Sequence, residues 1–300
     1  MPKLTRPKET RGELVKTVTA DGLILDGFLA PPRGRTAGAF IFIHGLGSNF
    51  YRHSGTDFIQ PFHRINIAVL LANTRGHDMV NRMATTKGER RTFGATHERL
   101  SESHYDLDGW IRFAERRGFN RIFLCGHSLG AVKVGLYVRR GKRLRNVRGA
   151  IYASPPDMWN ENYRAVRQSR GVAVAKKLRR TGKGGILMPK GFMKYDQTVE
   201  SYLDKMDPTR KNNIFNFVKR EFPWAQKFKR PQLLIYGDHD EPVKNNNPKT
   251  ALAVFQSVVP HADTICIKGA NHNYAGKRRV FYSAVARWVK NVIHTTHAAY

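Results

Sequence analysis

The feature that most constrains this chain is a short apolar run that ends in a Gly-x-Ser-x-Gly pentapeptide. Residues 121–125 (RIFLC) are typical of a buried strand, residues 126–130 read GHSLG, and residues 131–138 (AVKVGLYV) can form a helix. This succession predicts a nucleophile elbow, a sharp turn that holds a serine clear of a sheet. The two glycines lack a Cβ, so the strand and the helix can approach closely there. Ser128 is therefore the candidate nucleophile.

Other apolar runs alternate with segments of helical periodicity along the chain. An N-terminal β-hairpin is expected at residues 14–30, around Asp21-Gly22. The remaining strands are expected at 39–43, 67–72, 121–125, 150–153, 232–236 and 264–267. Helices are expected at 105–117, 131–138, 248–258 and 278–293. This order predicts an α/β fold with a doubly wound, mostly parallel sheet.

The alternation stops in residues 155–230, which are rich in Arg, Lys and aromatic side chains. Helices are expected at 162–180 and 199–220. We interpret this segment as an inserted helical cap over the carboxyl edge of the sheet, with aromatics facing a pocket; packing of the same aromatics against the core is the alternative. The expected organisation is a flexible N-terminus at 1–12, an α/β core at 13–154 and 231–300, and the cap at 155–230.

The composition excludes several classes of protein. A net charge of +29 and a pI near 10.6 favour anionic partners, but no zinc-finger or RNP-like signature indicates specific nucleic-acid binding. No run of eighteen apolar residues and no secretory signal is visible, so a cytoplasmic protein is expected. Cys125 and Cys266 lie in expected core strands and are interpreted as small buried residues. The twelve histidines show no metal-ligand spacing, so neither a metal nor a cofactor is expected.

A serine nucleophile needs a general base and an anion that orients this base. In a parallel sheet all three groups are expected at carboxyl ends of strands. GDHDEPV at 237–243 and GANH at 269–272 follow two predicted strands and supply Asp240 and His272. Asp238, two residues before Asp240, and Asp157, after the strand that follows the elbow, are alternative acids.

Four motifs give the chain a family resemblance: HGLGS at 44–48, GHSLG at 126–130, GDHDEPV at 237–243 and GANH at 269–272. From about residue 39 to 292, the chain resembles the α/β-hydrolase superfamily, in particular capped serine hydrolases such as monoacylglycerol-lipase-like enzymes and carboxylesterases. The resemblance implies that Ser128 is the nucleophile, His272 the general acid/base and Asp240 the orienting carboxylate. It also implies an oxyanion hole formed by the backbone N–H groups of Leu46 and Leu129.

Residues 73–78 (NTRGHD) resemble the family's R-G-H-G turn, with Asp78 where glycine is usual. His44 and His127 are interpreted as structural, and His77 and His239 as solvent-facing. The candidates for substrate contact are apolar residues of the expected cap, namely Met158, Trp159, Phe192 and Met193.

The sequence therefore predicts a serine hydrolase that cleaves a carboxylic ester or lactone through an acyl-enzyme on Ser128. A thioesterase or acyltransferase of a biosynthetic pathway is the alternative, since a basic cap could dock an acidic carrier protein or coenzyme A phosphates. A non-hydrolytic enzyme or a binder on the same fold is a third hypothesis. The expected ligand is a small ester or acyl compound, and the positive charge is compatible with an anionic one. The acyl group, the leaving group and the oligomeric state are not indicated.

Overall fold

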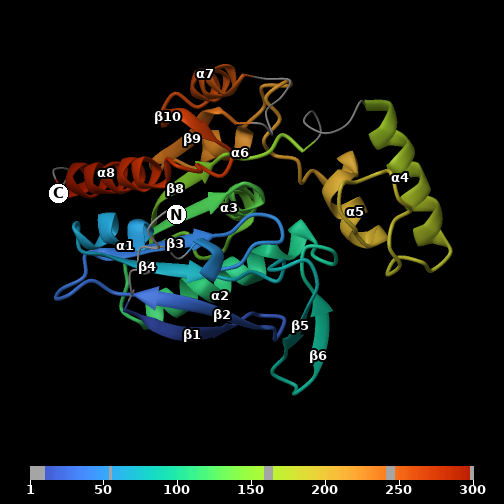
Figure 1. The fold of residues 1–300 in the computed structure, drawn as a ribbon, viewed down its shortest axis with the longest axis horizontal. Helices are drawn as coiled ribbons and strands as arrows, with labels where there is room; N and C mark the ends of the chain where they lie inside the picture. The colour runs from blue at the N-terminus through green and yellow to red at the C-terminus, as the bar shows by residue number, and fades with distance from the viewer. Residues whose placement is uncertain (1–10, 54–55, 159–164, 241–246, 298–300) are drawn as a thin grey trace, which may run out of the picture.

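The computed structural model describes residues 11–53, 56–158, 165–240 and 247–297 (Figure 1). Its strands are β1 (Glu13–Val18), β2 (Ile24–Ala30), β3 (Gly38–Ile43), β4 (Ile67–Ala72), β5 (Asn81–Ala84), β6 (Arg90–Phe93), β7 (Ile122–His127), β8 (Val147–Ala153), β9 (Gln232–His239) and β10 (Ala262–Asn271). Its helices are α1 (Thr56–His63), α2 (Ser103–Arg116), α3 (Leu129–Arg140), α4 (Ala165–Arg180), α5 (Val199–Met206), α6 (Pro223–Lys227), α7 (Pro248–Val258) and α8 (Arg278–His297). The expected N-terminal tail lies almost wholly outside the described residues.

Eight strands form one sheet in the order β1-β2-β4-β3-β7-β8-β9-β10. Within this sheet, β4, β3, β7, β8, β9 and β10 are parallel to one another. In contrast, β1 and β2 pair antiparallel with each other, and β2 pairs antiparallel with β4. Every residue of β3, β4 and β7 is buried, as expected for strands covered on both faces. The α/β class, the mostly parallel sheet and the N-terminal hairpin are confirmed.

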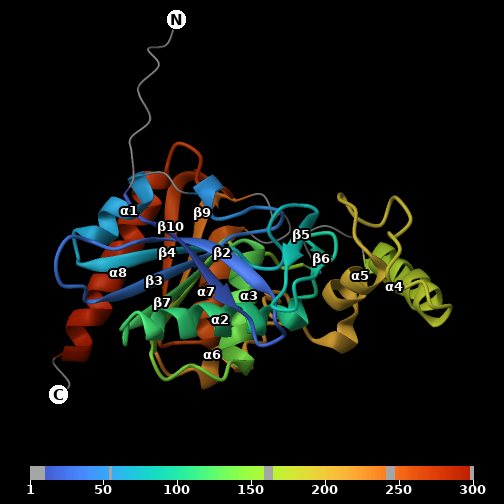
Figure 2. The same ribbon diagram turned by 90° about the horizontal axis from the view of Figure 1, so that it is seen from below.

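The two faces of the sheet carry separate apolar clusters. In β3, Ile41 and Ile43 join the cluster that contains α2, α3 and α7, while Phe40 and Phe42 join the cluster of α1 and α8. Successive side chains of a strand point to opposite faces, so one strand contributes to both clusters. Figure 2 shows α1 and α8 on the side of the sheet opposite α2 and α3. The doubly wound arrangement brings the carboxyl ends of β3, β7, β9 and β10 to one edge.

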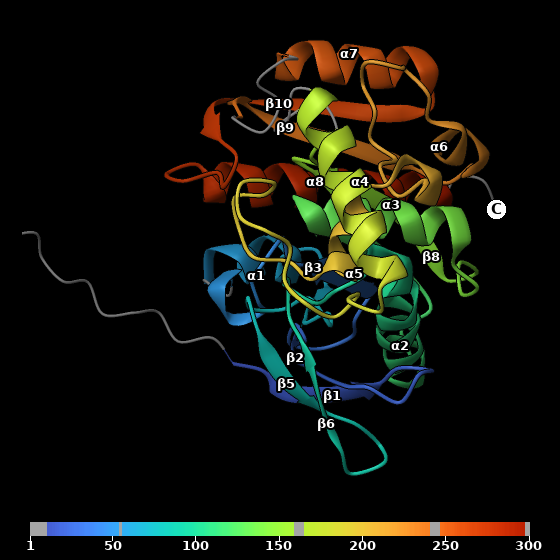
Figure 3. The same cartoon turned by 90° about the vertical axis from the view of Figure 1, so that its right-hand side faces the viewer.

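Helices α4 and α5 with their connecting loop, residues 165–206, form a unit that we call the α4–α5 unit. It lies at one end of the molecule beyond the carboxyl edge of the sheet (Figures 1 and 3). The unit has an apolar cluster of its own, made of Val172, Ala175, Met188, Val199, Tyr202, Leu203 and Met206. This cluster is separate from the two clusters that cover the sheet, so the unit is packed as a small body joined to the larger one.

The expected helix at 199–220 is wrong beyond Met206. Asp207 caps the following 3-10 turn by accepting a hydrogen bond from the amide of Thr209, and Pro208 cannot continue the α-helical bonding. The aromatics that follow pack into the main apolar cluster, where Trp224 lies 5.3 Å from the ring of Tyr152. For residues 214–228, core packing of the aromatics therefore replaces the expected pocket-facing arrangement.

Two further features differ from the sequence expectations. Residues 81–93, where no strand is predicted from the sequence, form the β5–β6 hairpin that extends away from the sheet in Figure 3. Its strands carry Arg82, Arg90 and Arg91, so they lack the apolar alternation that marks a half-buried strand. Cys125 is buried, and burial raises the pKa of its thiol, whereas Cys266 is only half-buried because β10 is an edge strand.

Candidate active site

The serine of the pentapeptide stands at the junction of β7 and α3. Ser128 has φ 56° and ψ −124°, a conformation that a residue with a side chain adopts only when its surroundings enforce it. Its amide donates to the carbonyl of Ala153 in the neighbouring strand β8 at 2.8 Å, and its carbonyl accepts from the amide of Ala131 at 2.9 Å. The elbow geometry predicted from the sequence is thus present in the backbone.

The glycines of this region permit backbone contacts that a side chain would prevent. A Cβ on Gly126 would lie 2.1 Å from the carbonyl oxygen of Gly130, and a Cβ on Gly130 would lie 2.2 Å from that of Ile43. A Cβ on Gly45 would lie 3.0 Å from the Cβ of Ser128 and 3.6 Å from its Oγ. The turn at residues 44–48, which we call the oxyanion turn, therefore lies directly against the serine.

Three side chains from different strand ends form a continuous hydrogen-bonded chain. His272, just after β10, places Nε2 2.9 Å from the Ser128 Oγ and Nδ1 3.0 Å from Oδ1 of Asp240, just after β9. The Asp240 side chain has no exposed area, whereas that of His272 is 20% exposed. A histidine between a buried carboxylate and a serine hydroxyl can remove the serine proton, because the carboxylate stabilises the imidazolium that forms.

The two alternative acids are bonded elsewhere. Oδ1 of Asp238 accepts from the amide of Gly269 at 2.7 Å, which fastens the end of β9 to the turn in β10. Asp157 is buried and accepts from the amide of Phe217 at 3.1 Å. The structure thus brings Asp240 to His272, while Asp238 and Asp157 hold backbone segments in place.

Both predicted oxyanion donors border the serine. Leu129 is the first residue of α3, where amides have no intrahelical acceptor and the helix end attracts negative charge. The other amide, that of Leu46, belongs to the same planar peptide unit as the carbonyl of Gly45. His44 holds this carbonyl: its Nε2 accepts from the amide of Thr74 at 3.1 Å, so Nδ1 carries the proton and donates to the Gly45 oxygen at 2.8 Å.

The four histidines discussed from the sequence fall into three situations. His44 and His127 are buried, and His127 places Nε2 2.7 Å from the carbonyl oxygen of His272, which fixes the backbone of that residue. His239 is solvent-facing, with 73% of its side chain exposed. The prediction for His77 is wrong, because Asn81 covers its ring and its Nδ1 lies 2.9 Å from Oδ2 of Asp78.

Asp78 adopts the left-handed conformation that explains why glycine is usual at this position. Its φ is 57°, and asparagine and aspartate tolerate this region better than other residues with side chains. The side chain of Asn49 donates to Oδ1 of Asp78 at 2.7 Å, and the backbone amide of Asp78 donates to the carbonyl of Ser48 at 3.0 Å. These bonds attach the turn after β4 to the oxyanion turn.

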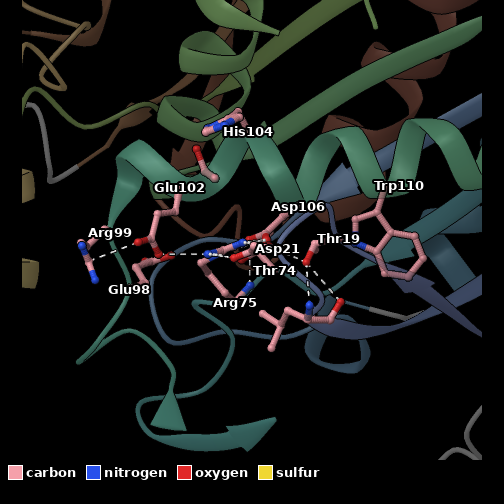
Figure 4. Close-up of polar contacts among 12 residues, drawn as sticks. Thr19, Asp21, Thr74, Arg75, Glu98, Arg99, Glu102, His104, Asp106 and Trp110 are labelled. Carbon is pink, nitrogen blue, oxygen red and sulfur yellow. Dashed lines mark hydrogen bonds and ion pairs between the residues drawn. The ribbon is translucent and has the colours of Figure 1, made fainter. Parts of the chain in front are cut away.

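A buried arginine, Arg75, anchors the turn after β4 (Figure 4). Arg75, with 1% of its side chain exposed, donates through Nε to Asp106 at 2.9 Å and through Nη1 to Asp21 at 3.0 Å and Glu102 at 2.9 Å. Burial opposes its charge, but the Asp106 and Asp21 carboxylates together outweigh this effect and raise the pKa of Arg75 above its ordinary value. The sequence resemblance placed Arg75 in a turn, and nothing in the local pattern indicated its three acidic partners.

The candidate substrate residues lie in apolar packing. Met158 is buried in the main apolar cluster, and Phe192 and Met193 pack against the cluster of the α4–α5 unit. Trp159 lies outside the described residues. A substrate contact by any of these residues stays a prediction.

Within the described parts of the chain, no group of three His, Cys, Asp or Glu side chains is arranged to hold a metal ion. None of the helices described has the length and apolar composition to cross a membrane.

Comparison with known proteins places the chain in a family. The model of the alpha/beta hydrolase family matches residues 40–284, so the chain belongs to this family. No curated protein sequence is significantly similar to it.

Solved structures share the fold at low sequence identity. A soluble variant of the Saccharomyces cerevisiae monoglyceride lipase, in complex with a substrate analogue, is 15% identical, with 97% of this chain and 99% of that chain covered and a TM-score of 0.68. Est1E from Butyrivibrio proteoclasticus with ferulic acid bound is 18% identical over 93% of this chain and 100% of that chain, with a TM-score of 0.63. The Paleococcus ferrophilus monoacylglycerol lipase is 19% identical over 94% and 100%, with a TM-score of 0.60.

Proposed function

We propose that this member of the alpha/beta hydrolase family is a serine hydrolase of carboxylic esters or lactones. The observation that carries the proposal is the chain Ser128 Oγ, His272 Nε2, His272 Nδ1 and Asp240 Oδ1, with contacts of 2.9 and 3.0 Å at a strained elbow. Asp240 is buried and bonded to Nδ1, so it selects the tautomer in which Nε2 is free to accept the serine proton.

The reaction proceeds in two transfers of an acyl group. His272 takes the Ser128 proton while Oγ forms a bond to the ester carbonyl carbon, and the carbonyl oxygen becomes an oxyanion facing the amides of Leu46 and Leu129. The oxyanion collapses, the ester C–O bond breaks, and the alcohol leaves with the proton from His272. Water then attacks the acyl-enzyme, gives its proton to His272, and releases the acid as Ser128 recovers a proton.

Two solved structures of similar fold support esters as the substrates to test first. Among the structures similar in fold, one holds ferulic acid and another, a monoglyceride lipase, holds a substrate analogue.

The α4–α5 unit lies beyond the carboxyl edge of the sheet, and residues 155–158 lead toward it from β8, so we propose that it acts as the cap over Ser128. The acyl specificity then depends on what the unit places above the serine.

The proposal is tested by hydrolysis of p-nitrophenyl esters with acyl chains of two to twelve carbons and of monoacylglycerols. The wild type is expected to hydrolyse at least one series, and Ser128→Ala is expected to lose the activity while keeping the far-ultraviolet circular dichroism of the wild type. Wild-type protein that is folded and inert toward every ester, or a Ser128→Ala variant of unchanged activity, contradicts the proposal.

Exposed cations of the α4–α5 unit favour a second candidate, a thioesterase or acyltransferase with an anionic acyl carrier. The unit exposes Lys177, Arg180, Lys183, Lys190 and Lys194 to solvent. Attraction between such cations and a phosphate-bearing carrier is screened by salt. Acyl-CoA hydrolysis with a KM that rises steeply between 50 and 500 mM NaCl supports this candidate, and a KM independent of salt contradicts it.

A further inference from the structure

A lysine is completely buried in the helix that follows the nucleophile. Lys133, on α3, has no exposed side-chain area, and its Nζ lies 2.6 Å from Oε2 of Glu98, whose side chain is 1% exposed. Burying two charges costs several kcal/mol per ion before their attraction is counted, so a pair of this kind needs additional hydrogen bonds. The proposed reaction uses neither residue as an acid, a base or a nucleophile.

The additional hydrogen bond of Lys133 leads toward the oxyanion turn. Its Nζ also donates to Oγ1 of Thr74 at 2.9 Å. Because the ammonium occupies an acceptor site of this oxygen, the hydroxyl hydrogen of Thr74 is directed away from Lys133. The acceptor on that side is Nε2 of His44, which lies 3.2 Å from Oγ1. Both the hydroxyl and the amide of Thr74 can then donate to the same ring nitrogen.

Donation to Nε2 fixes the tautomer of His44. With Nε2 as acceptor, Nδ1 carries the proton and donates to the carbonyl of Gly45 at 2.8 Å. This carbonyl and the amide of Leu46 lie in one peptide plane, with the N–H pointing opposite to the C=O. A bond that holds the Gly45 oxygen therefore aims the Leu46 amide, the proposed oxyanion donor.

Glu98 is fitted against the backbone of the same loop. A Cβ on Gly76 would lie 1.8 Å from Oε2 of Glu98, so any other residue at this position would displace the carboxylate from the loop that contains Thr74. Figure 4 shows Glu98 and Thr74 beside the Arg75 network. A second buried lysine, Lys205 on α5, lies 3.9 Å from Oε1 of Glu98 and donates to the Ala95 carbonyl at 3.0 Å and the Ser201 hydroxyl at 3.1 Å.

We infer that Lys133 and Glu98 are positioning residues that act through Thr74 and His44 to aim the Leu46 amide at the oxyanion. This inference rests on the proposed ester hydrolysis at Ser128 and adds the residues that set one oxyanion donor. Loss of a whole oxyanion donor costs about a hundredfold to a thousandfold in kcat. A donor that stays in place but loses its alignment is expected to cost about tenfold or more.

The test compares Lys133→Met, Thr74→Val and their double variant with the wild type, with rates expressed per serine titrated by a fluorophosphonate. Lys133→Met is expected to lower kcat for an ester about tenfold or more with KM within threefold, and to weaken binding of a trifluoromethyl ketone by the same factor. Such a ketone forms an oxyanion at the serine, so its affinity reports the oxyanion hole. The double variant is expected to lose no more than the stronger single variant, because both changes interrupt one path.

The matched control is Lys205→Met, which removes a buried lysine that lies 3.9 Å from Oε1 of Glu98 but contacts neither Thr74 nor His44 in the bonds described, so the bond from Lys133 to Thr74 remains. Its kcat per titrated serine is expected within threefold of the wild type. If Lys133→Met fails to fold, the charge-neutral pair Glu98→Gln with Lys133→Met and the single variant Thr74→Val replace it with the same expected loss.

Three results overturn the inference: variants with kcat within threefold of the wild type, a loss of kcat with unchanged ketone affinity, or an equal loss in Lys205→Met. A wild type that is not titrated by the fluorophosphonate instead refutes the proposed function itself, so the two failures are distinguishable.

Discussion

Replacing Asp240 by asparagine tests which carboxylate orients the histidine. Oδ1 of Asp240 lies 3.0 Å from Nδ1 of His272, and the side chain is inaccessible to solvent. An amide at this position removes the negative charge that stabilises the imidazolium and can donate to Nδ1, which favours the wrong tautomer. In a serine protease the corresponding change lowers kcat about 10⁴-fold. At about 1.36 kcal/mol per factor of ten, the expected loss is roughly 5 kcal/mol of transition-state stabilisation.

Asp238→Asn is the matched comparison, since it makes the same chemical change two residues earlier. Oδ1 of Asp238 accepts from the Gly269 amide at 2.7 Å, and an asparagine oxygen can still accept this bond. The change weakens a charge-assisted hydrogen bond, so we expect a stability loss of about 1 kcal/mol and a kcat within about fivefold of the wild type.

The assay is steady-state hydrolysis of the best p-nitrophenyl ester, with the folded fraction of each variant checked by thermal denaturation. The reasoning is refuted if Asp238→Asn loses more activity than Asp240→Asn, or if Asp240→Asn keeps more than a tenth of the wild-type kcat.

Three further predictions concern the backbone and the core. Gly130→Ala should prevent assembly of the elbow, because the new Cβ would lie 2.2 Å from the Ile43 carbonyl oxygen; soluble protein with wild-type kcat would contradict this. Leu124→Ala, at a fully buried position of β7, should lower the free energy of unfolding by about 2–5 kcal/mol. Leu14→Ala, at a position 79% exposed, should change it by less than about 0.5 kcal/mol; urea titration compares the two. Burial lowers the pKa of Lys205 to about 8, against the attraction of Glu98. The unfolded chain, with a lysine pKa of about 10.4, therefore binds more protons between these two values, and stability rises with pH there by up to roughly 3 kcal/mol. Urea titrations at pH 7.5 and 10 should show the wild type gaining stability relative to Lys205→Met, and a relative loss would contradict the burial of this charge.

The sheet was predictable because its central strands are buried on both faces. Runs such as residues 67–72 have no polar position, and β4 covers the same residues. The helix predicted at 248–258 has the same bounds as α7, since Asn247 caps it and Pro248 occupies its first position. These signals are local, so they do not depend on what the rest of the chain does.

Most of the elements that were missed or misjudged depend on distant contacts. The β5–β6 hairpin has charged residues where the alternation of a strand would be expected, and α1 contains Pro61 within a short segment. The helix expected to continue to residue 220 ends before Pro208. This proline is a local stop signal, but the periodicity of the apolar residues favoured a longer helix. Residues 214–228 pack against an aromatic surface formed by Tyr152 of β8 and Phe255 of α7, which no window of sequence displays.

The site divides in the same way. Motif order indicated Ser128, Asp240 and His272, and the structure places these three side chains in contact. The buried charges around them could not be paired from the sequence, because Arg75 meets Asp21 and Asp106 from two other segments. One signal was available: a lysine within the apolar stretch at 131–138 is unusual for a buried helix and marks a position that needs a partner.

The most direct test of the account is to identify the residue that carries the acyl group or its analogue. After reaction with a fluorophosphonate, intact-protein mass spectrometry should show one adduct, and fragmentation of the peptide that contains GHSLG should place it on Ser128. The adduct should be absent from Ser128→Ala and should form far more slowly in His272→Gln. Ester hydrolysis by wild-type protein without a label on Ser128, or a label on another residue, would contradict the central claim.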